Sequence, residues 1–294
     1  GFKLMKSGFV SLVGRTNVGK STILNAIIGE KISIVTSKSQ TTRDQIIGIY
    51  NDNDSQIVFL DTPGIHKPHN ELGELLDKRA YSTIRNCELA LFVIDASNDL
   101  GEGDYYLMDH LKFDCDMIIV FNKIDLTNIQ LITKVKDVYL KKYPNTDFIE
   151  ISAKEKFNLD GLIKLIKNHL KEGPQYYDVH TITDKDFRFR VQEIVREKAL
   201  ICLKDEVPHG IAVLCDDIDY SKKELEIYAK IIVEKESQKG IVIGKGAKMI
   251  KKIGILARKD IEEMLKKHVN LVLNVQVQEN WRNSSSFLAK IGYR

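Results

Sequence analysis

The chain has 294 residues, a length that suits two domains better than one. Hydrophobic residues make up 43% and charged residues 29%, an ordinary balance for a globular protein. The net charge of +3 excludes attraction of nucleic acid by the whole surface, although a local basic region is compatible with it. The sequence contains no run of 18 apolar residues and no signal-peptide core, so we expect no membrane span and no secretion signal.

The four cysteines have spacings that fit neither a metal-ligand pattern nor a C-x-x-C redox pair. We therefore expect reduced, buried thiols of a cytosolic protein. They are Cys87, Cys115, Cys202 and Cys215.

Short apolar runs rich in branched residues alternate with amphipathic stretches in the first half of the chain. This pattern predicts an α/β domain with a doubly wound, mostly parallel sheet. An extra strand at 45–50 should pair antiparallel with 56–60 through the turn-forming residues 51–55. The predicted parallel strands are 9–13, 57–60, 89–94, 117–121 and 148–151, and the predicted helices are 20–28, 72–86, 104–112, 130–142 and 160–170.

The alternating pattern stops at Gly173-Pro174, which predicts an α/β domain over 1–173 and a linker over 174–185. A smaller α+β domain is expected over 186–294, with the order α-β-β-α-β. Its elements are a helix at 186–203, strands at 210–217 and 224–235, a helix from the Gly244–Gly246 turn to 268, and a strand at 270–277.

The segment Gly14–Ser21 matches the phosphate-binding pattern G-x-x-x-x-G-K-S/T between a predicted strand and a predicted helix. Glycines let the backbone N–H groups and the helix N-terminus approach phosphate. Lys20 should reach the β- and γ-phosphates, and the Ser21 hydroxyl should bind Mg²⁺. The Asn17 amide oxygen could coordinate a monovalent cation such as K⁺, and loop geometry alone explains this residue equally well.

Asp61-Thr-Pro-Gly64 follows the apolar strand that ends at Leu60. Asp61 should hold Mg²⁺, and Gly64 should offer its N–H to the γ-phosphate. We expect Thr42, in preference to Thr41, to complete the Mg²⁺ site. Lys20, Thr42 and Gly64 are the predicted catalytic residues, and Ser21, Thr42 and Asp61 the predicted metal ligands.

Many GTPases orient the attacking water with a glutamine directly after this aspartate motif. The chain has Ile65 there, which cannot hydrogen-bond water, so we expect slow intrinsic hydrolysis. Arg43 could help to neutralise charge.

Asn122-Lys-Ile-Asp125 follows another predicted strand and favours guanine. A carboxylate at Asp125 can accept hydrogen bonds from N1–H and N2–H of guanine, whereas adenine would leave it unpaired, which argues against an ATP-dependent enzyme. Ser152-Ala-Lys154 should form the second wall of the base site. The predicted nucleotide-binding residues are Gly14, Asn17, Val18, Gly19, Lys20, Ser21, Thr22, Asp61, Gly64, Asn122, Lys123, Asp125, Ser152, Ala153 and Lys154.

Residues 238–268 contain nine Lys or Arg against three Asp or Glu. Within them Ile241–Ile243 is interpreted as an apolar strand, followed by the loop Gly244–Ala247. A loop of small residues admits a single-stranded RNA backbone, and neighbouring lysines can meet its phosphates. A solvated basic helix face is the alternative. The predicted RNA contacts are Ile243, Gly244, Lys245, Gly246, Ala247, Lys248, Ile250, Lys251, Lys252 and Arg258, with Ile243 and Ile250 lining a base groove.

These motifs together resemble the Era family of bacterial GTPases over nearly the whole chain. Further shared segments are Gln40–Arg43, Asp61–Pro68, Arg196–Lys198, Glu206–His209, Lys252–Gly254, Ala257–Asp260 and Trp281-Arg282. Thr16 and Ser39 stand where that family usually has proline, and Ala247 where the RNA loop usually ends in glycine.

The resemblance implies a GTPase domain and a KH-type domain that binds the 3′ end of small-subunit ribosomal RNA and assists small-subunit assembly. It also implies a cytoplasmic location with peripheral contact to the inner membrane, and we expect a monomer. The alternative is a GTPase whose second domain binds a protein or the membrane surface.

Overall fold

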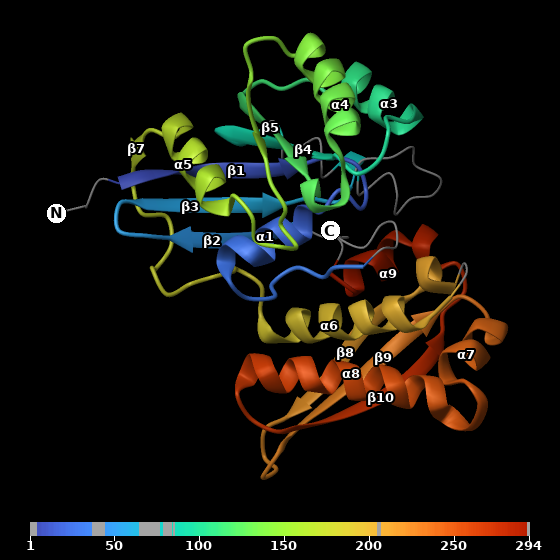
Figure 1. Ribbon diagram of the computed structural model, residues 1–294. Helices are drawn as coiled ribbons and strands as arrows, with labels where there is room; N and C mark the ends of the chain where they lie inside the picture. Colours follow the sequence, from blue (N-terminus) through green and yellow to red (C-terminus); the bar gives the residue numbers. More distant parts are fainter. Residues whose placement is uncertain are drawn as a thin grey trace. The chain divides into compact units, whose positions relative to one another are not determined.

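The computed structural model describes residues 5–36, 45–64, 77–78, 84, 86–204 and 207–292. Contacts divide the chain into two compact units, and the main-chain boundary lies between Asp184 and Lys185 (Figure 1). Among the described residues, no helix has both the length and the apolar character needed to cross a membrane. The helix predicted over 72–86 lies largely outside the described residues.

The first unit is built on the predicted parallel sheet, with the strand order β2-β3-β1-β4-β5-β6. The predicted hairpin is confirmed, because β2 runs antiparallel to β3. A short strand, β7, pairs antiparallel with the start of β1. The bounds are β1 Met5–Val13, β2 Ile46–Asn51, β3 Ser55–Asp61, β4 Leu89–Asp95, β5 Asp116–Asn122, β6 Asp147–Glu150 and β7 Glu172–Gly173.

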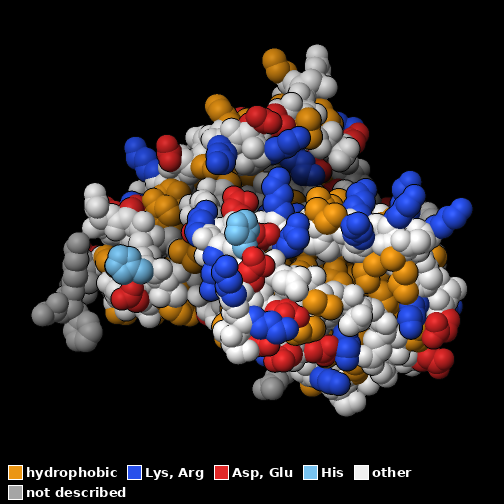
Figure 2. All heavy atoms as spheres, turned by 90° about the horizontal axis from the view of Figure 1, so that it is seen from below, with side chains coloured by type: hydrophobic (Ala, Val, Ile, Leu, Met, Phe, Trp, Pro, Cys, Tyr) orange, Lys and Arg blue, Asp and Glu red, His pale blue; other side chains and the backbone are white. Residues whose placement is uncertain are grey.

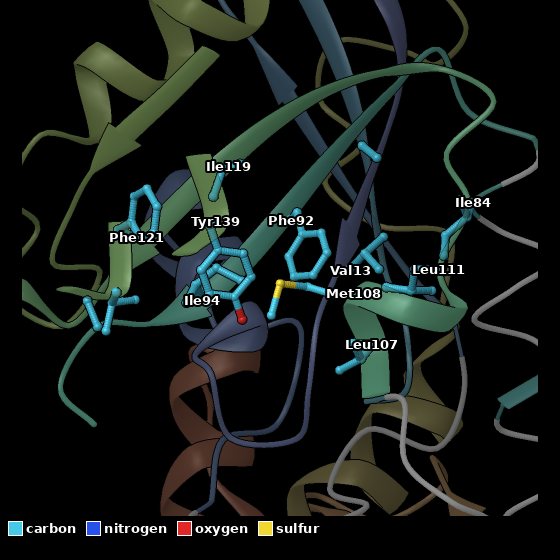
Figure 3. Close-up of a cluster of buried hydrophobic side chains, with 13 residues drawn as sticks. Val13, Ile84, Phe92, Ile94, Leu107, Met108, Leu111, Ile119, Phe121 and Tyr139 are labelled. Carbon is cyan, nitrogen blue, oxygen red and sulfur yellow. The ribbon is translucent and has the colours of Figure 1, made fainter. Parts of the chain in front are cut away.

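Helices cover both faces of this sheet, with α3 and α4 on one face (Figure 1). Phe92 of β4 packs 5.8 Å from the ring of Tyr139 on α4, and Phe121 of β5 packs 6.1 Å from that same ring (Figure 3). Burial of each such side chain stabilises the fold by about 1.5–3 kcal/mol. The bounds are α1 Lys20–Ile28, α3 Glu102–His110, α4 Ile129–Lys142 and α5 Leu159–His169. Parallel strands between helix layers bring the loops after β1, β3, β4, β5 and β6 to one edge, where ligands bind in such sheets.

The segment predicted as a linker is attached to the first unit over most of its length. The Gln56 side chain accepts hydrogen bonds from the N–H groups of Tyr176 (2.8 Å) and Tyr177 (3.0 Å). Further along, the N–H of Ile49 donates to the carbonyl of Ile182 at 2.9 Å. Residues 176–182 therefore follow strands β2 and β3 and belong to the first compact unit.

The second unit has a three-stranded sheet in the order β10-β9-β8, in which β10 is parallel and β8 antiparallel to β9. The helices α6 and α8 pack against each other and against this sheet. Along α8, Ile253, Ala257 and Ile261 recur at every fourth position and are fully buried. The bounds are α6 Phe187–Cys202, β8 Ala212–Asp219, β9 Leu225–Val233, α7 Glu236–Ile243, α8 Lys248–Leu265, β10 Val269–Val277 and α9 Ser285–Lys290.

The prediction of a strand at Ile241–Ile243 is wrong, because these residues form the last turn of the helix α7. The Gln238 side chain caps this helix by accepting hydrogen bonds from the N–H groups of Glu234 and Lys235. A three-residue apolar run has too few residues to distinguish strand from helix periodicity. The order is therefore α-β-β-α-α-β-α, and the glycine loop joins two helices.

Several motifs shared with the Era family hold the second unit together. Trp281 is fully buried, and its indole N–H donates to the carbonyl of Gly210 at 2.9 Å. Arg282 pairs with Glu234 at 2.8 Å. Lys198 of α6 pairs with Asp260 of α8 at 2.7 Å. These contacts tie the segment after β10 to residues beside β8 and β9, and they join α6 to α8.

Candidate nucleotide-binding and RNA-binding sites

The loop after β1 has a conformation that only glycine permits at its end. Gly19 caps α1 with φ 102°, and a Cβ atom there would lie 2.2 Å from the Asn122 side chain. The buried Lys20 donates to the carbonyls of Gly14 (3.2 Å) and Arg15 (2.7 Å). Burial lowers the pKa of Lys20 to about 8, and the charge of Asp61 opposes this shift. The loop thus holds the Lys20 ammonium group beside the N-terminus of α1, an arrangement that suits phosphate binding.

The end of β3 brings Asp61 against the start of α1. Asp61 Oδ2 accepts hydrogen bonds from the hydroxyls of Ser21 (2.8 Å) and Ser33 (2.7 Å). Burial raises the pKa of this carboxyl, and both hydroxyls and Lys20 oppose that shift. The other oxygen, Oδ1, is buried without a hydrogen-bond partner among the described residues.

Ser33 was not predicted from the sequence as part of this site. Asn25 of α1 positions it, because its side chain donates to the Ser33 carbonyl (2.7 Å) and accepts from the Ser33 N–H (3.0 Å). The contact depends on the loop after α1 folding back on the helix. No local sequence pattern predicts that this loop folds back on α1.

Gly64 lies directly against the phosphate-type loop. A Cβ atom at this position would lie 2.8 Å from the backbone nitrogen of Thr16, so a larger residue would displace the loop. The predicted residues Thr42 and Arg43, and Ile65 after the aspartate motif, lie outside the described residues.

The loop after β5 connects the two halves of the proposed site. The Asn122 side chain donates to the carbonyl of Val18 (2.9 Å) and accepts from the N–H of Ala153 (3.1 Å). Asp125 accepts from the Ser152 hydroxyl at 2.7 Å. These bonds join the loops after β1, β5 and β6 into one structure.

Lys123 adds a fourth connection to the same assembly. Its ammonium donates to the carbonyl of Asn17 (2.6 Å) and pairs with Asp95 at the end of β4 (2.9 Å). Its backbone has φ 65°, so the residue turns back toward the loop after β1. Asp95 was not predicted as a site residue, although its position at a strand end is a usable signal.

The remaining predicted residues lie around this core. Asn17 is exposed, with φ 62°, a left-handed conformation that asparagine tolerates better than most residues. Thr22 is half-buried in the first turn of α1, and Lys154 is exposed beyond Ala153. The conformation of Asn17 supports the loop-geometry interpretation of this residue.

The glycine loop of the second unit has three positions with positive φ between α7 and α8. Gly244 has φ 73°, and a Cβ atom there would lie 2.7 Å from the Met249 side chain. Gly246 has φ 60° and Ala247 φ 58°. A non-glycine residue in this region costs about 1–2 kcal/mol. Lys245, Lys248, Lys251, Lys252 and Arg258 are all exposed on the loop or on α8.

A cleft of about 780 Å³ lies beside this loop, within the second unit. Ile241 and Met249 line it from either side of the loop, and Lys204 and Lys235 contribute charge. The predicted base-groove residues Ile243 and Ile250 are not among its lining residues. Figure 2 shows Lys and Arg side chains gathered around exposed apolar side chains on one face of the molecule.

The parallel sheet, the phosphate-type loop after β1 and the guanine-type loop after β5 define a P-loop GTPase domain, and the second unit has the arrangement of a KH domain. Residues 9–123 match the family described as 50S ribosome-binding GTPase, and residues 206–282 match the KH domain family. GTPase Era of Alkaliphilus oremlandii is 47% identical over 98% of this chain and 99% of its own length. GTPase Era of Lacticaseibacillus paracasei is 46% identical over 98% and 96%. The chain belongs to the GTPase Era family.

Two solved structures are similar to the whole chain. One is a variant of Aquifex aeolicus Era bound to GDP and AlF4⁻, and the other is Era in complex with MgGDPNP and nucleotides 1506–1542 of 16S ribosomal RNA. Each has a TM-score of 0.93 and 37% identity, and covers 98% of this chain and 99% of the other.

Proposed function

We propose that this chain binds and hydrolyses GTP, and that its KH domain binds single-stranded RNA at the 3′ end of small-subunit ribosomal RNA during subunit assembly. The observation that carries the proposal is the pair of hydrogen bonds made by the Asn122 side chain. One joins it to Val18 in the loop after β1, and the other joins it to Ala153 in the loop after β6. Such a junction would couple recognition of the base to placement of the phosphates.

The residues around Asp61 fit a magnesium ion. Asp61 Oδ1 is buried without a hydrogen-bond partner among the described residues, and two hydroxyls surround Oδ2. Carboxylate and hydroxyl oxygens are ligands that Mg²⁺ accepts when substrate phosphates complete its shell. Asp61 and Ser21 would hold the ion, with Thr42 as the proposed third ligand. When bound, Mg²⁺ supplies positive charge beside the phosphates.

The chain's own contribution to hydrolysis is positioning and charge. Lys20 would exchange its two carbonyl partners for phosphate oxygens, with no change in its burial. The N–H of Gly64 would hold the γ-phosphate, and the N-terminus of α1 would favour its negative charge. The apolar side chain of Ile65 cannot hydrogen-bond water, so intrinsic turnover should be slow. We also propose that Asn17 binds a monovalent cation such as K⁺.

Guanine selection would depend on Asp125. The Ser152 hydroxyl donates to one oxygen of this carboxylate at 2.7 Å, which would hold the group in place for the base. A carboxylate accepts from both N1–H and N2–H of guanine, and each hydrogen bond to a charged group contributes about 1.5–3 kcal/mol. Adenine offers no matching pair of donors.

The relative solved with 16S ribosomal RNA supports the small subunit as the target, because its likeness to this chain spans both units. The family description that names the 50S ribosome matches residues 9–123 alone. We further propose a cytoplasmic monomer with peripheral contact to the inner face of the membrane. The basic and apolar exposed residues of α8, such as Lys251 and Ile255, support such a contact.

The test of base selection is Asp125→Asn with GTP and xanthosine triphosphate. An amide donates where the carboxylate accepted, so GTP affinity should fall about 10-fold or more. Xanthine carries a carbonyl in place of the guanine amino group and should bind the variant better than wild type. Unchanged preference for GTP would contradict the proposed base site.

The test of the RNA function is binding of a single-stranded oligonucleotide of the small-subunit 3′ end, at several salt concentrations, with GDP and with a non-hydrolysable GTP analogue. Lys245→Glu and Lys248→Glu should each weaken binding about tenfold and make the salt dependence shallower. Lys259→Glu is the matched control, because it makes the same charge change on α8 about 16 Å from Lys248.

Three results would contradict parts of the RNA proposal. Equal losses in all three variants would indicate attraction by general charge, without a groove at the loop. Equal affinity for RNA with GDP and with the GTP analogue would contradict a nucleotide switch. Tighter binding to anionic vesicles than to RNA would favour the membrane alternative.

A further inference from the structure

Two cysteines that are far apart in sequence meet at one end of the GTPase sheet. Cys87 lies two residues before β4, and Cys115 lies one residue before β5. The strands are parallel neighbours in which Leu89 pairs with Asp116, so both thiols lie at the amino ends of adjacent strands. Their sulfur atoms are 3.5 Å apart. The proposed nucleotide loops lie at the opposite, carboxyl ends of these strands.

The surroundings of this pair differ from those of the other two cysteines. Cys87 and Cys115 are half-buried and pack at the margin of the core cluster drawn in Figure 3. Cys202 and Cys215 are buried in the second unit, and burial raises the pKa of Cys215 to about 11. A thiol must be reachable to react, and of the four cysteines only Cys87 and Cys115 are half-buried rather than buried.

We propose that Cys87 and Cys115 form a reversible dithiol–disulfide site that is oxidised by low-molecular-weight disulfides. The Cys115 thiolate attacks one sulfur of the small disulfide, forms a mixed disulfide and releases one small thiolate. Cys87 then loses its proton, and its sulfur attacks the Cys115 sulfur and releases the second small thiol. Two protein thiols are oxidised to one disulfide, and one small disulfide is reduced to two thiols.

The hydrogen bond between the two sulfurs assigns the order of attack. The hydrogen bond with Cys87 lowers the pKa of Cys115, and burial and the charges of Asp116 and Asp114 oppose this shift. The same hydrogen bond raises the pKa of Cys87, and burial adds to the effect. Cys115 is therefore the attacking thiol and Cys87 the resolving thiol.

The geometry requires little movement for closure. A disulfide bond is about 2.05 Å long, so the sulfurs, which are 3.5 Å apart, must approach by about 1.5 Å. The 27 intervening residues include β4 and α3, so the cross-link joins neighbours in the folded sheet that are distant along the chain. Fast closure therefore requires the folded protein.

The experiment treats the full-length, reduced protein with oxidised glutathione and maps its peptides by mass spectrometry. Wild type should form one Cys87–Cys115 cross-link that dithiothreitol reverses, with no bound glutathione and with Cys202 and Cys215 still reduced. Cys87→Ser should accumulate glutathione on Cys115. Cys115→Ser should react at least ten times more slowly. The double variant Cys202→Ser, Cys215→Ser is the matched control and should cross-link like wild type.

Several results would overturn the proposal. Wild-type protein that keeps glutathione on Cys115 without closing the cross-link would show that Cys87 does not resolve it. Cross-links to Cys202 or Cys215 at a comparable rate would show that folded proximity does not control the reaction. The wild-type peptide map decides these points even if a serine variant fails to fold.

Discussion

The two proposed sites of this chain are built in opposite ways. The nucleotide site consists of buried polar groups that bond one another across loops, as at Asn122 and at Asp61. The RNA loop consists of exposed backbone and exposed lysines between two helices. Desolvated, fixed groups select a ligand by its pattern of donors and acceptors. Exposed charges attract any phosphate backbone, and salt screens them.

The contrast predicts how each site should fail. Removal of one buried partner leaves another polar group without a partner, so effects in the nucleotide site should be large and insensitive to salt. Removal of one surface lysine leaves no unsatisfied group behind, so effects in the RNA loop should be modest and strongly dependent on salt.

Lys20→Ala should produce the largest effect. Loss of a fixed charge beside the transferring phosphate costs about 10²–10³ in turnover number, so GTP hydrolysis should fall by that factor in single-turnover assays. RNA affinity in the absence of nucleotide should be unchanged. Lys142→Ala, which removes an exposed lysine at the end of α4, is the control and should leave hydrolysis unchanged. A loss of RNA binding in Lys20→Ala would break the separation of the two sites.

Ser33→Ala should have the second largest effect, because it removes a hydroxyl that orients Asp61. A hydrogen bond to a charged group contributes about 1.5–3 kcal/mol, so the Mg²⁺ concentration for half-maximal hydrolysis should rise about tenfold or more. Ser11→Ala is the control, since that buried hydroxyl on β1 has no partner among the described residues. An unchanged Mg²⁺ dependence would show that Ser33 does not position Asp61.

The pH dependence of nucleotide binding should reveal the buried state of Lys20. Its pKa is lowered to about 8 by burial, and bound phosphates favour the charged form and raise that pKa again. Binding therefore takes up a proton above pH 8, and GDP affinity should fall about threefold between pH 7.5 and 8.5. Lys20→Ala should lose this dependence, and calorimetry in buffers of different ionisation enthalpy measures the proton directly. A variant with the same slope as wild type would assign the proton to another group.

Ala247→Gly should give the smallest effect, and it tests whether the backbone of the RNA loop is strained at this residue. Relief of the left-handed conformation outweighs the extra flexibility of glycine in the unfolded chain. The free energy of unfolding in urea should rise by about 0.5 kcal/mol. Ala257→Gly, at a buried helical position on α8, should lower it by about 1 kcal/mol. Destabilisation by both substitutions would mean that the loop does not strain Ala247.

Much of the fold follows from patterns that are local in sequence. Short, branched, apolar runs predicted the parallel strands, because strands buried on both faces must be continuously hydrophobic. The turn-forming residues 51–55 predicted the hairpin of β2 and β3 for an equally local reason. The helix α7 was missed because its apolar residues are few, and its cap depends on Gln238 reaching back to Glu234.

The predicted nucleotide-site residues with described positions converge on one edge of the sheet, since each follows a parallel strand or begins a helix. Asn25, Ser33 and Asp95 were not predicted, because their roles come from contacts between loops. The spacing of 28 residues between Cys87 and Cys115 likewise contains no sign that the two thiols are neighbours.

The amino-acid sequence by itself determined the strand and helix order of the first unit, the motif after each strand and the presence of a basic glycine loop. These properties depend on residues within a few positions of one another, where hydrophobic period and backbone freedom act directly. Only the tertiary structure decided that Ser33 meets Asp61, that Asn122 joins two loops and that Cys87 meets Cys115. Those contacts depend on the order of strands in the sheet and the return of loops, which are set by packing across the whole unit.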